Sequence, residues 1–268
     1  MNFISDHLNW FKDTGEEIKT EEGKTIRIFI FDYVYDEKIL NSWACHFRNH
    51  YCLDNEIDIL RDGTNLTRKE YLEKIKFPDK SSYPGPLTRA GDFSEILISD
   101  YLEYILGYWV PRTRYRDKVR RNESTKGVDI IGFKFFHSHK FSAKDELITW
   151  EVKSKYTGKL NESILQKAIK DSGKDFNIRL AESLNSIKQR LEKNKEKISR
   201  FQNFDDNPYK LRNGAAAFIV STLLKREINT GKTTSNHPNQ ENLSLIIVHG
   251  KNMMDLIHEL YKRAANEA

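Results

Sequence analysis

Two short stretches, Gly127-Val-Asp-Ile-Ile-Gly132 and Trp150-Glu-Val-Lys-Ser154, decide how this chain folds. Each lies in a run rich in β-branched and aromatic residues (127–136 and 146–154), and a polar segment separates the two runs. This composition and spacing are typical of two β-strands joined by a loop. We therefore predict an antiparallel hairpin.

Three charged side chains of this hairpin are predicted to meet. Side chains alternate between the faces of a strand, so Glu151 and Lys153 project from one face and their apolar neighbours from the other. Asp129 stands between two apolar residues, which pack on the opposite side. If the strands pair, Asp129, Glu151 and Lys153 converge. The alternative, a salt bridge on a solvated sheet face, fits the apolar character of both strands poorly.

Two carboxylates in a half-buried sheet need a compensating charge, because each raises the pKa of the other and burial disfavours ionisation. A divalent cation supplies that charge, and hard oxygen ligands suit Mg²⁺ or Mn²⁺. Such a metal activates water, and a neighbouring ammonium orients that water and offsets developing charge. We predict Asp129 and Glu151 as metal ligands, Lys153 as the residue that positions water, and phosphodiester hydrolysis as the reaction.

The segments around the hairpin predict an α/β (α+β) fold. Apolar residues recur at helical spacing over residues 93–107, 175–201 and 252–265, and each range is expected to form one helix. The short apolar runs 215–222 and 243–249 are typical of buried strands. These elements predict a layered architecture, with a mixed central sheet flanked by helices.

A break in the pattern divides the chain. The stretch Ser81-Ser-Tyr-Pro-Gly-Pro86 interrupts regular structure, because two prolines and a glycine do not continue a helix or a central strand. We place a boundary there, with a small N-terminal accessory domain at 1–85 and the nuclease domain at 86–268. The accessory region is the candidate docking surface for a partner. Its aromatic residues could anchor an interface, although core packing is favoured for each of Trp10, Phe11, Tyr33, Tyr35 and Trp43.

The bulk composition describes a globular protein outside the membrane. Apolar residues make up 38% of the 268 residues, and no stretch approaches the run of about 18 needed to span a bilayer. The N-terminus lacks the pattern of a secretory signal. Cys45 and Cys52 suggest no disulfide framework, so a cytoplasmic setting is expected. They flank His46 and His50, but the spacing does not match known zinc modules, and we reject zinc there.

Positive charge is concentrated in one segment. Residues 112–126 carry seven basic and two acidic side chains, a difference of +5 that equals the net charge of the whole chain. Such a concentration is typical of a contact with nucleic acid, although a solvated loop explains it equally well. The residues predicted to bind DNA are Arg112, Arg114, Arg116, Lys118, Arg120, Arg121 and Lys126.

The string Asp129…Glu151-Val-Lys153 resembles the signature of the PD-(D/E)xK nuclease superfamily. In that superfamily an acidic residue precedes an acid-x-lysine on the next strand, and a helical glutamate often lies upstream. Glu95, in Arg89-Ala-Gly-Asp-Phe-Ser-Glu95, matches the upstream glutamate, whereas Val128 replaces the proline of the name. The resemblance implies a restriction-endonuclease-like core and a catalytic role for Glu95. The first turn of a helix, where we expect Glu95, also favours any glutamate through the helix dipole, so both interpretations stay open.

A second resemblance is more specific. The order Arg89-Ala-Gly-Asp-x-x-Glu95, Pro111-Arg, Lys126–Phe133 and Glu151-Val-Lys153 is similar to that of the HamA family, the nuclease subunits of Hachiman-type anti-phage systems. This resemblance implies a DNA nuclease in antiviral defence that works with a helicase partner, HamB. Two alternatives remain from the sequence. One is a catalytically inactive DNA-binding or adaptor subunit, and the other is a restriction-system endonuclease subunit on the same fold.

Overall fold

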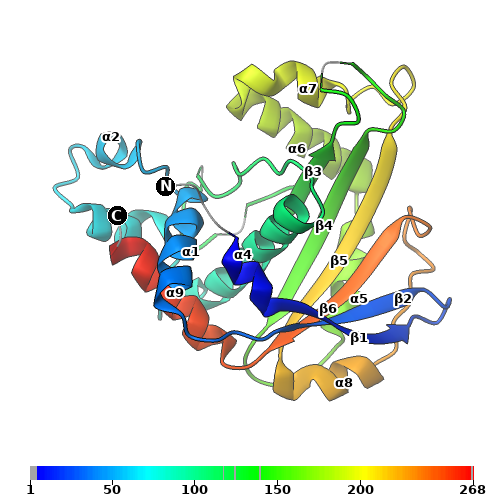
Figure 1. Cartoon of the computed structure of the whole chain (residues 1–268), viewed down its shortest axis with the longest axis horizontal. Coiled ribbons are helices and arrows are strands. Elements are labelled where there is room, and N and C mark those ends of the chain that lie inside the picture. The colour runs from blue at the N-terminus through cyan, green and yellow to red at the C-terminus, as the bar shows by residue number, and fades with distance from the viewer. Residues whose placement is uncertain (1–4, 117, 124, 139, 267) are drawn as a thin grey trace.

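The protein is built around one mixed sheet, as a computed structural model shows for residues 5–116, 118–123, 125–138, 140–266 and 268. Within these residues the sheet has six strands in the order β1-β2-β6-β5-β4-β3 (Figure 1). The strands are β1 (Phe11–Lys19), β2 (Thr25–Phe31), β3 (Ile130–Lys134), β4 (Glu146–Lys155), β5 (Lys210–Val220) and β6 (Leu243–Gly250).

The central four strands are parallel and the two edges are antiparallel. β2, β6, β5 and β4 run in one direction, while β1 pairs with β2 and β3 pairs with β4 in the opposite sense. β5 and β6 are almost fully buried, as expected for parallel strands covered on both faces. The mixed sheet flanked by helices confirms the predicted fold class.

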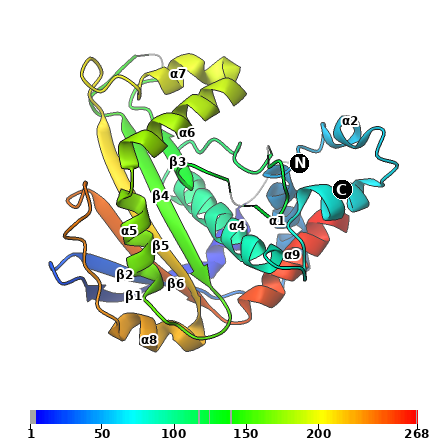
Figure 2. The same cartoon turned by 180° about the vertical axis from the view of Figure 1, so that it is seen from behind.

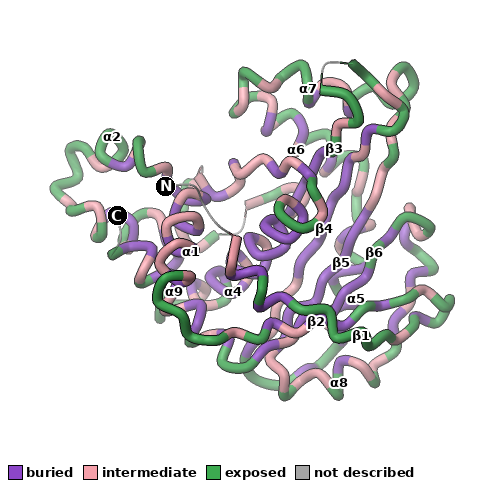
Figure 3. The backbone as a smooth tube through the Cα atoms, viewed as in Figure 1, coloured by how far each residue is buried: buried purple, intermediate pink, exposed green. Residues whose placement is uncertain are grey.

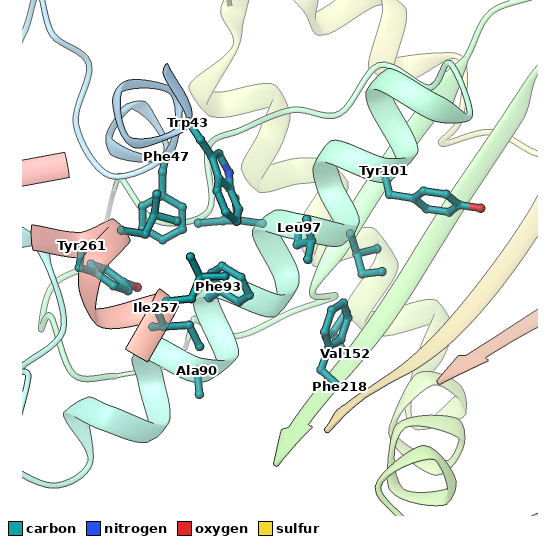
Figure 4. Close-up of a cluster of buried hydrophobic side chains, with 14 of the residues drawn as sticks. Trp43, Phe47, Ala90, Phe93, Leu97, Tyr101, Val152, Phe218, Ile257 and Tyr261 are labelled. Carbon is teal, nitrogen blue, oxygen red and sulfur yellow. The ribbon is translucent and has the colours of Figure 1, made fainter. Parts of the chain in front are cut away.

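One face of the sheet carries the largest core. It is covered by α4 (Gly85–Asp100), α1 (Glu37–Asn49) and α9 (Met253–Asn266). Phe93 and Leu97 of α4 pack toward Val152 and Phe218 of the sheet, and Trp43 of α1 closes the far side (Figure 4). Trp150 and Val152 both belong to this core, so the predicted alternation along β4 is confirmed.

The opposite face has two smaller cores. α5 (Ile164–Gly173) lies over β4 and β5, and α6 (Phe176–Arg190) packs with α7 (Lys195–Ser199) against the β3–β4 hairpin (Figure 2). Glu151 and Lys153 belong to this face, because they alternate with Trp150 and Val152. The acid-x-lysine of the hairpin is therefore directed toward α5 and α6.

The first 85 residues share the sheet and the main core with the rest of the chain. β2 pairs in parallel with β6, and α1 packs against α9. A boundary near residue 86 would therefore cut through both the sheet and its core. Two further elements are α2 (Ile57–Arg61) and α3 (Arg68–Tyr71, continued by a π-helical turn at Leu72–Lys76). α2 projects from this body and is largely exposed (Figure 3), whereas α3 packs against α9 and Tyr71 and Leu72 are buried.

Several helix boundaries differ from the sequence-based expectation. α4 begins at Gly85 instead of residue 93, because Pro86 occupies its first turn, where a missing N–H costs nothing. The single helix expected over 175–201 is interrupted at Leu191, whose φ of −114° and ψ of 65° are not helical. α5 and the short α8 (Leu224–Asn229) were not predicted. None of the helices in the described ranges is long and apolar enough to cross a membrane.

Candidate active site

The predicted hairpin places Asp129 beside the acid-x-lysine. Ile130 pairs with Trp150 in an antiparallel register, so Asp129 lies immediately before β3 and next to Glu151. Its Oδ2 accepts a hydrogen bond from the backbone N–H of Val152 at 3.0 Å. Gly127, two residues earlier, has a φ of +97°, and a Cβ there would lie 2.6 Å from Oγ of Ser183. Glycine is required for this turn into the strand.

Glu151 and Lys153 form a paired centre on the α5–α6 face. Nζ of Lys153 lies 2.6 Å from Oε1 of Glu151 and 3.0 Å from Oδ2 of Asp171 on α5. Arg179 of α6 donates to the other oxygen, Oε2 of Glu151, at 2.9 Å and to the carbonyl of Gly127 at 2.7 Å. Both oxygens of the buried Glu151 carboxylate therefore face a protein cation.

Glu95 is connected to Asp129 through Arg114. Nη2 of Arg114 donates to Oδ1 of Asp129 at 2.8 Å, and Nε of Arg114 lies 3.1 Å from Oε2 of Glu95. The hydroxyl of Tyr115 donates to the same Glu95 oxygen at 2.6 Å. Glu95 is the eleventh residue of α4, not a residue of its first turn, so the helix dipole does not explain its position. Its side chain instead contacts Arg114 and Tyr115 beside Asp129.

The pKa shifts follow from burial and charge crowding. Burial raises the pKa of Glu95 to about 8, although Arg114 lowers it, and Asp129 raises it further. Burial also raises the pKa of Glu151, again reinforced by Asp129. For Lys153, burial lowers the pKa, but the charges of Glu151 and Asp129 outweigh burial and raise it. An added cation is therefore favourable for the carboxylates, because it would stabilise their ionised forms while any proton is released to solvent.

The donor set fits a hard divalent metal at two of the three acids. Asp129 and Glu151 offer carboxylate oxygens at neighbouring positions of the hairpin. Arg114, Lys153 and Arg179 already pair with these two carboxylates, so positive charge is favourable there. Glu95 is separated from this pair by the Arg114 guanidinium. The oxygens of Glu95, Asp129 and Glu151 do not all lie within 4.8 Å of one another. The structure thus brings Asp129, Glu151 and Lys153 together and holds Glu95 behind Arg114.

A cleft of about 440 Å³ opens beside Asp129. One wall is α6, through Glu182, Ser183 and Ser186, and the other is the loop between Val110 and Asp129. Ile130, Ile131 and Ile187 form apolar surface inside it. The cleft gives a solvent-filled approach to the Asp129 side of the site.

Three cations of the basic segment form ion pairs with acidic residues of α4. Arg112 contacts Asp100 at 2.8 Å, Arg114 contacts Glu95 at 3.1 Å, and Lys118 contacts Asp92 at 2.5 Å. The partners run in opposite directions along the chain, so the segment lies antiparallel to the helix. Arg121 is likewise paired with Asp79 at 2.6 Å. Much of the charge concentration in the sequence is therefore neutralised inside the fold.

The other predicted DNA-binding residues are more available. The side chain of Arg120 is 79% exposed, and among the described residues its ion pair is with Glu123, a contact that water screens strongly. Lys126 is exposed at the cleft. Arg116 is partly buried. DNA binding by the seven residues stays a prediction, and Arg120 and Lys126 are its best-placed members.

A second cluster surrounds Asp100, the last residue of α4. One ring nitrogen of His46, one of His50 and a carboxylate oxygen of Asp100 lie within 4.8 Å of one another, the one such grouping among the described residues. Arg112 already fills it, with Nη1 2.8 Å from Asp100 and 2.5 Å from Nε2 of His50. Nε2 of His7 lies 2.9 Å from the other Asp100 oxygen. The cluster is a buried ion-pair network, because a guanidinium occupies the place of a metal.

Two site residues escaped the sequence analysis. Asp171 and Arg179 lie on α5 and at the start of α6, and both contact the Glu151–Lys153 pair. The signal for α5 was present: Ser163 caps the helix by accepting from the Gln166 N–H, and Leu165, Ala168 and Ile169 recur at helical spacing. Once α5 is recognised, Asp171 faces the strand that carries Lys153.

Fold and site together define an α/β protein in which an acid immediately precedes one strand and an acid-x-lysine lies on the adjacent antiparallel strand, an order similar to the PD-(D/E)xK signature. The HamA family model matches residues 6–264, so the chain belongs to the HamA family. This membership indicates a protein of a Hachiman antiviral defence system. No curated protein matches the sequence significantly.

Proposed function

We propose that this protein is a metal-dependent DNA nuclease, the effector subunit of a Hachiman defence complex with a HamB-like helicase. The observation that carries the proposal is the juxtaposition of Asp129 with Glu151 and Lys153 beside an open cleft. Membership of the HamA family supports the setting in antiviral defence. Acid, acid and ammonium on one rigid hairpin are the groups that phosphodiester hydrolysis requires.

Each residue of the centre has a distinct role in this proposal. Asp129 and Glu151 would hold Mg²⁺ or Mn²⁺, which when bound polarises a phosphoryl oxygen and lowers the pKa of a water molecule. Lys153, held by Glu151 and Asp171, would orient that water and offset negative charge on the phosphate. Arg179 fixes the rotamer of Glu151 and the turn at Gly127. Glu95 would contribute once Arg114 has moved.

The DNA and helicase partners belong to the same proposal. Arg120 and Lys126 at the cleft are suited to a phosphate backbone, since each offers an exposed cation. For the helicase, the projecting region of α2 is a better candidate than the aromatic residues of the N-terminal segment. Trp10, Phe11 and Trp43 are buried in the core, whereas the side chain of Ile59 on α2 is 77% exposed.

Cleavage of plasmid DNA by purified variants tests the nuclease assignment. Glu151→Gln and Lys153→Ala should lose Mg²⁺-dependent cleavage while thermal melts stay close to wild type. Lys155→Ala, two residues further along the same strand face, is the matched control and should cleave normally. A Lys153→Ala protein that cuts at the wild-type rate would refute the assignment, as would robust cleavage in excess EDTA.

One observation favours a second candidate, the inactive DNA-binding or adaptor subunit. Each of the two proposed metal ligands already pairs with a protein cation: Glu151 with Lys153 and Arg179, and Asp129 with Arg114. In an adaptor these pairs would be permanent. Calorimetric titration with Mn²⁺ separates the two functions, because only the nuclease requires a site that the metal can enter.

A further inference from the structure

The guanidinium of Arg114 occupies the space between two acids that come from different elements. It contacts Oδ1 of Asp129 from the hairpin and Oε2 of Glu95 from α4. It also donates to two backbone carbonyls, those of Val128 at 2.6 Å and Thr125 at 3.0 Å. A positive group thus stands where two carboxylates from separate elements would otherwise face each other.

The contact with Glu95 is geometrically poor. Nε of Arg114 is buried and lies 3.1 Å from Glu95, yet it makes no aligned hydrogen bond to any described residue. The same Glu95 oxygen receives a well-formed hydrogen bond from Tyr115. A buried donor without an aligned acceptor is costly, so the guanidinium is held here by charge more than by fit. Another cation could replace the Glu95 contact at little loss, whereas the hydrogen bonds of Arg114 to Asp129, Val128 and Thr125 have to break for the guanidinium to leave.

The Arg114 side chain also lies next to a cleft that could accommodate its guanidinium. Arg114 lines the 440 Å³ cleft together with Asp129, so a rotation of its side chain can carry the charged group into solvent-filled space. Arg179, which pairs with Glu151, also bonds to two backbone carbonyls, those of Asp171 and Gly127. It differs from Arg114 because it does not line this cleft.

We propose that Arg114 is a resident counter-cation that competes with the divalent metal for the Glu95–Asp129 pair, so that the metal is admitted only as the guanidinium leaves. The inference rests on the proposed metal-dependent function and adds a regulator to it. Without metal, Arg114 neutralises the buried acids and keeps the centre folded. With metal, like charges repel at short distance, and Arg114 moves to the cleft.

Calorimetric titration of the DNA-free protein with Mn²⁺ measures this competition directly. Arg114→Gln keeps hydrogen-bonding capacity but removes the charge, and it should bind Mn²⁺ at least about ten-fold more tightly than wild type, within the usual range of coupling between sites. Arg121→Gln is the matched control. It removes an ion-paired arginine of the same loop whose partner Asp79 is outside the site, and it should leave Mn²⁺ affinity unchanged.

A conservative variant covers the case in which Arg114→Gln does not fold. Arg114→Lys retains the charge on a shorter side chain that cannot span both acids, so its Mn²⁺ affinity should exceed that of wild type by a smaller factor. Unchanged or weaker Mn²⁺ binding in the folded Arg114 variants overturns the competition. Weaker binding would mean that Arg114 positions the ligands.

The outcomes separate this inference from the proposed function. If wild type binds Mn²⁺, Glu151→Gln abolishes that binding, and Arg114→Gln leaves it unaltered, the metal centre stands and only the competition fails. If neither wild type nor Arg114→Gln binds Mn²⁺, the metal centre itself is wrong. If Arg114→Gln binds Mn²⁺ and wild type does not, the result would support the proposed competition most strongly.

Discussion

Two acidic clusters flank the same helix and receive arginines from the same segment, yet they differ in what surrounds the acid. Asp100 is fully buried and is saturated by His7, His46 and Arg112. Asp129 borders an open cleft and faces Arg114. Arg112 and Arg114 are only two residues apart, and their side chains are similarly exposed, 15% and 16%.

The difference teaches that the environment of the acid, not the residue types, distinguishes a structural ion pair from a candidate centre. Asp100 is fully buried and does not line the cleft, although its partner Arg112 does. Asp129 lines the cleft itself and has a second acid, Glu151, on the next strand. We therefore expect the carboxylate–arginine pair to be permanent at Asp100 and, under the proposed competition, exchangeable at Asp129.

The largest expected effect is on stability, at the sealed cluster. Arg112→Met leaves Asp100 buried without its strongest charge partner and should lower the free energy of unfolding by about 3–5 kcal/mol. Urea unfolding followed by circular dichroism measures this loss. Arg121→Gln, at a partly exposed pair, should lose no more than about 1 kcal/mol. Equal losses in the two variants would remove the distinction between sealed and open ion pairs.

The next effect is on activity, at the open cluster. Lys153→Ala should reduce DNA cleavage by about 10²–10³-fold, the cost of removing one preorganised group that stabilises developing charge. Its melting temperature should stay near that of wild type, because the side chain is partly exposed. Rates of supercoiled-plasmid nicking give the measurement. If Lys153→Ala instead lost much stability and little activity, Lys153 would have a structural role like that of Arg112, and its proposed role in cleavage would be wrong.

The two clusters should respond to pH in opposite senses. Burial lowers the pKa of His7 and of His50, and for Asp100 burial is outweighed by His46 and Arg112, which hold its pKa well below the usual value. For all three the folded pKa lies below the unfolded one, so their stabilisation is complete above pH 6.5 and is lost as the pH falls.

Glu95 behaves in the reverse way in metal-free protein. Its folded pKa of about 8 exceeds the ordinary value of 4.5, so stabilisation present at acidic pH is lost as the pH rises from 4.5 to 8. The loss is roughly 1.4 kcal/mol per pH unit within that window. Urea unfolding in EDTA across pH 4–9 should show that Glu95→Gln removes the alkaline decline and keeps the acid one. An alkaline decline that persists in Glu95→Gln contradicts this account.

The smallest effect concerns the cations that the fold leaves available. Replacing Arg120 and Lys126 together by alanine should weaken DNA binding and reduce the slope of log affinity against log salt by up to about two phosphate contacts. Arg121→Gln, whose cation is already paired, should alter the slope less. Fluorescence anisotropy of a labelled duplex at several salt concentrations measures both. Equal slopes in wild type and the double variant would exclude a phosphate contact by this pair.

Local pattern was sufficient for the hairpin and for the placement of its charged side chains. The period of two along residues 150–154 indicated which side chains share a face, and the structure confirms that alternation. Strands β5 and β6 were also predicted, from the apolar runs 215–222 and 243–249. The α4 boundary was missed because proline is read as a breaker, although it is favoured in the first turn of a helix.

The sequence by itself determined the hairpin, strands β5 and β6, the fold class and the motif residues Asp129, Glu151 and Lys153, because periodicity and motif spacing are local properties of the chain. Only the tertiary structure showed which cations of the basic segment are paired with acids inside the fold. Its partners Asp92, Glu95 and Asp100 lie on a helix that precedes it in sequence, and no local pattern shows that the two elements pack together. Charge in a sequence is a sum over residues, whereas its effect depends on which opposite charges the fold brings within a few ångströms.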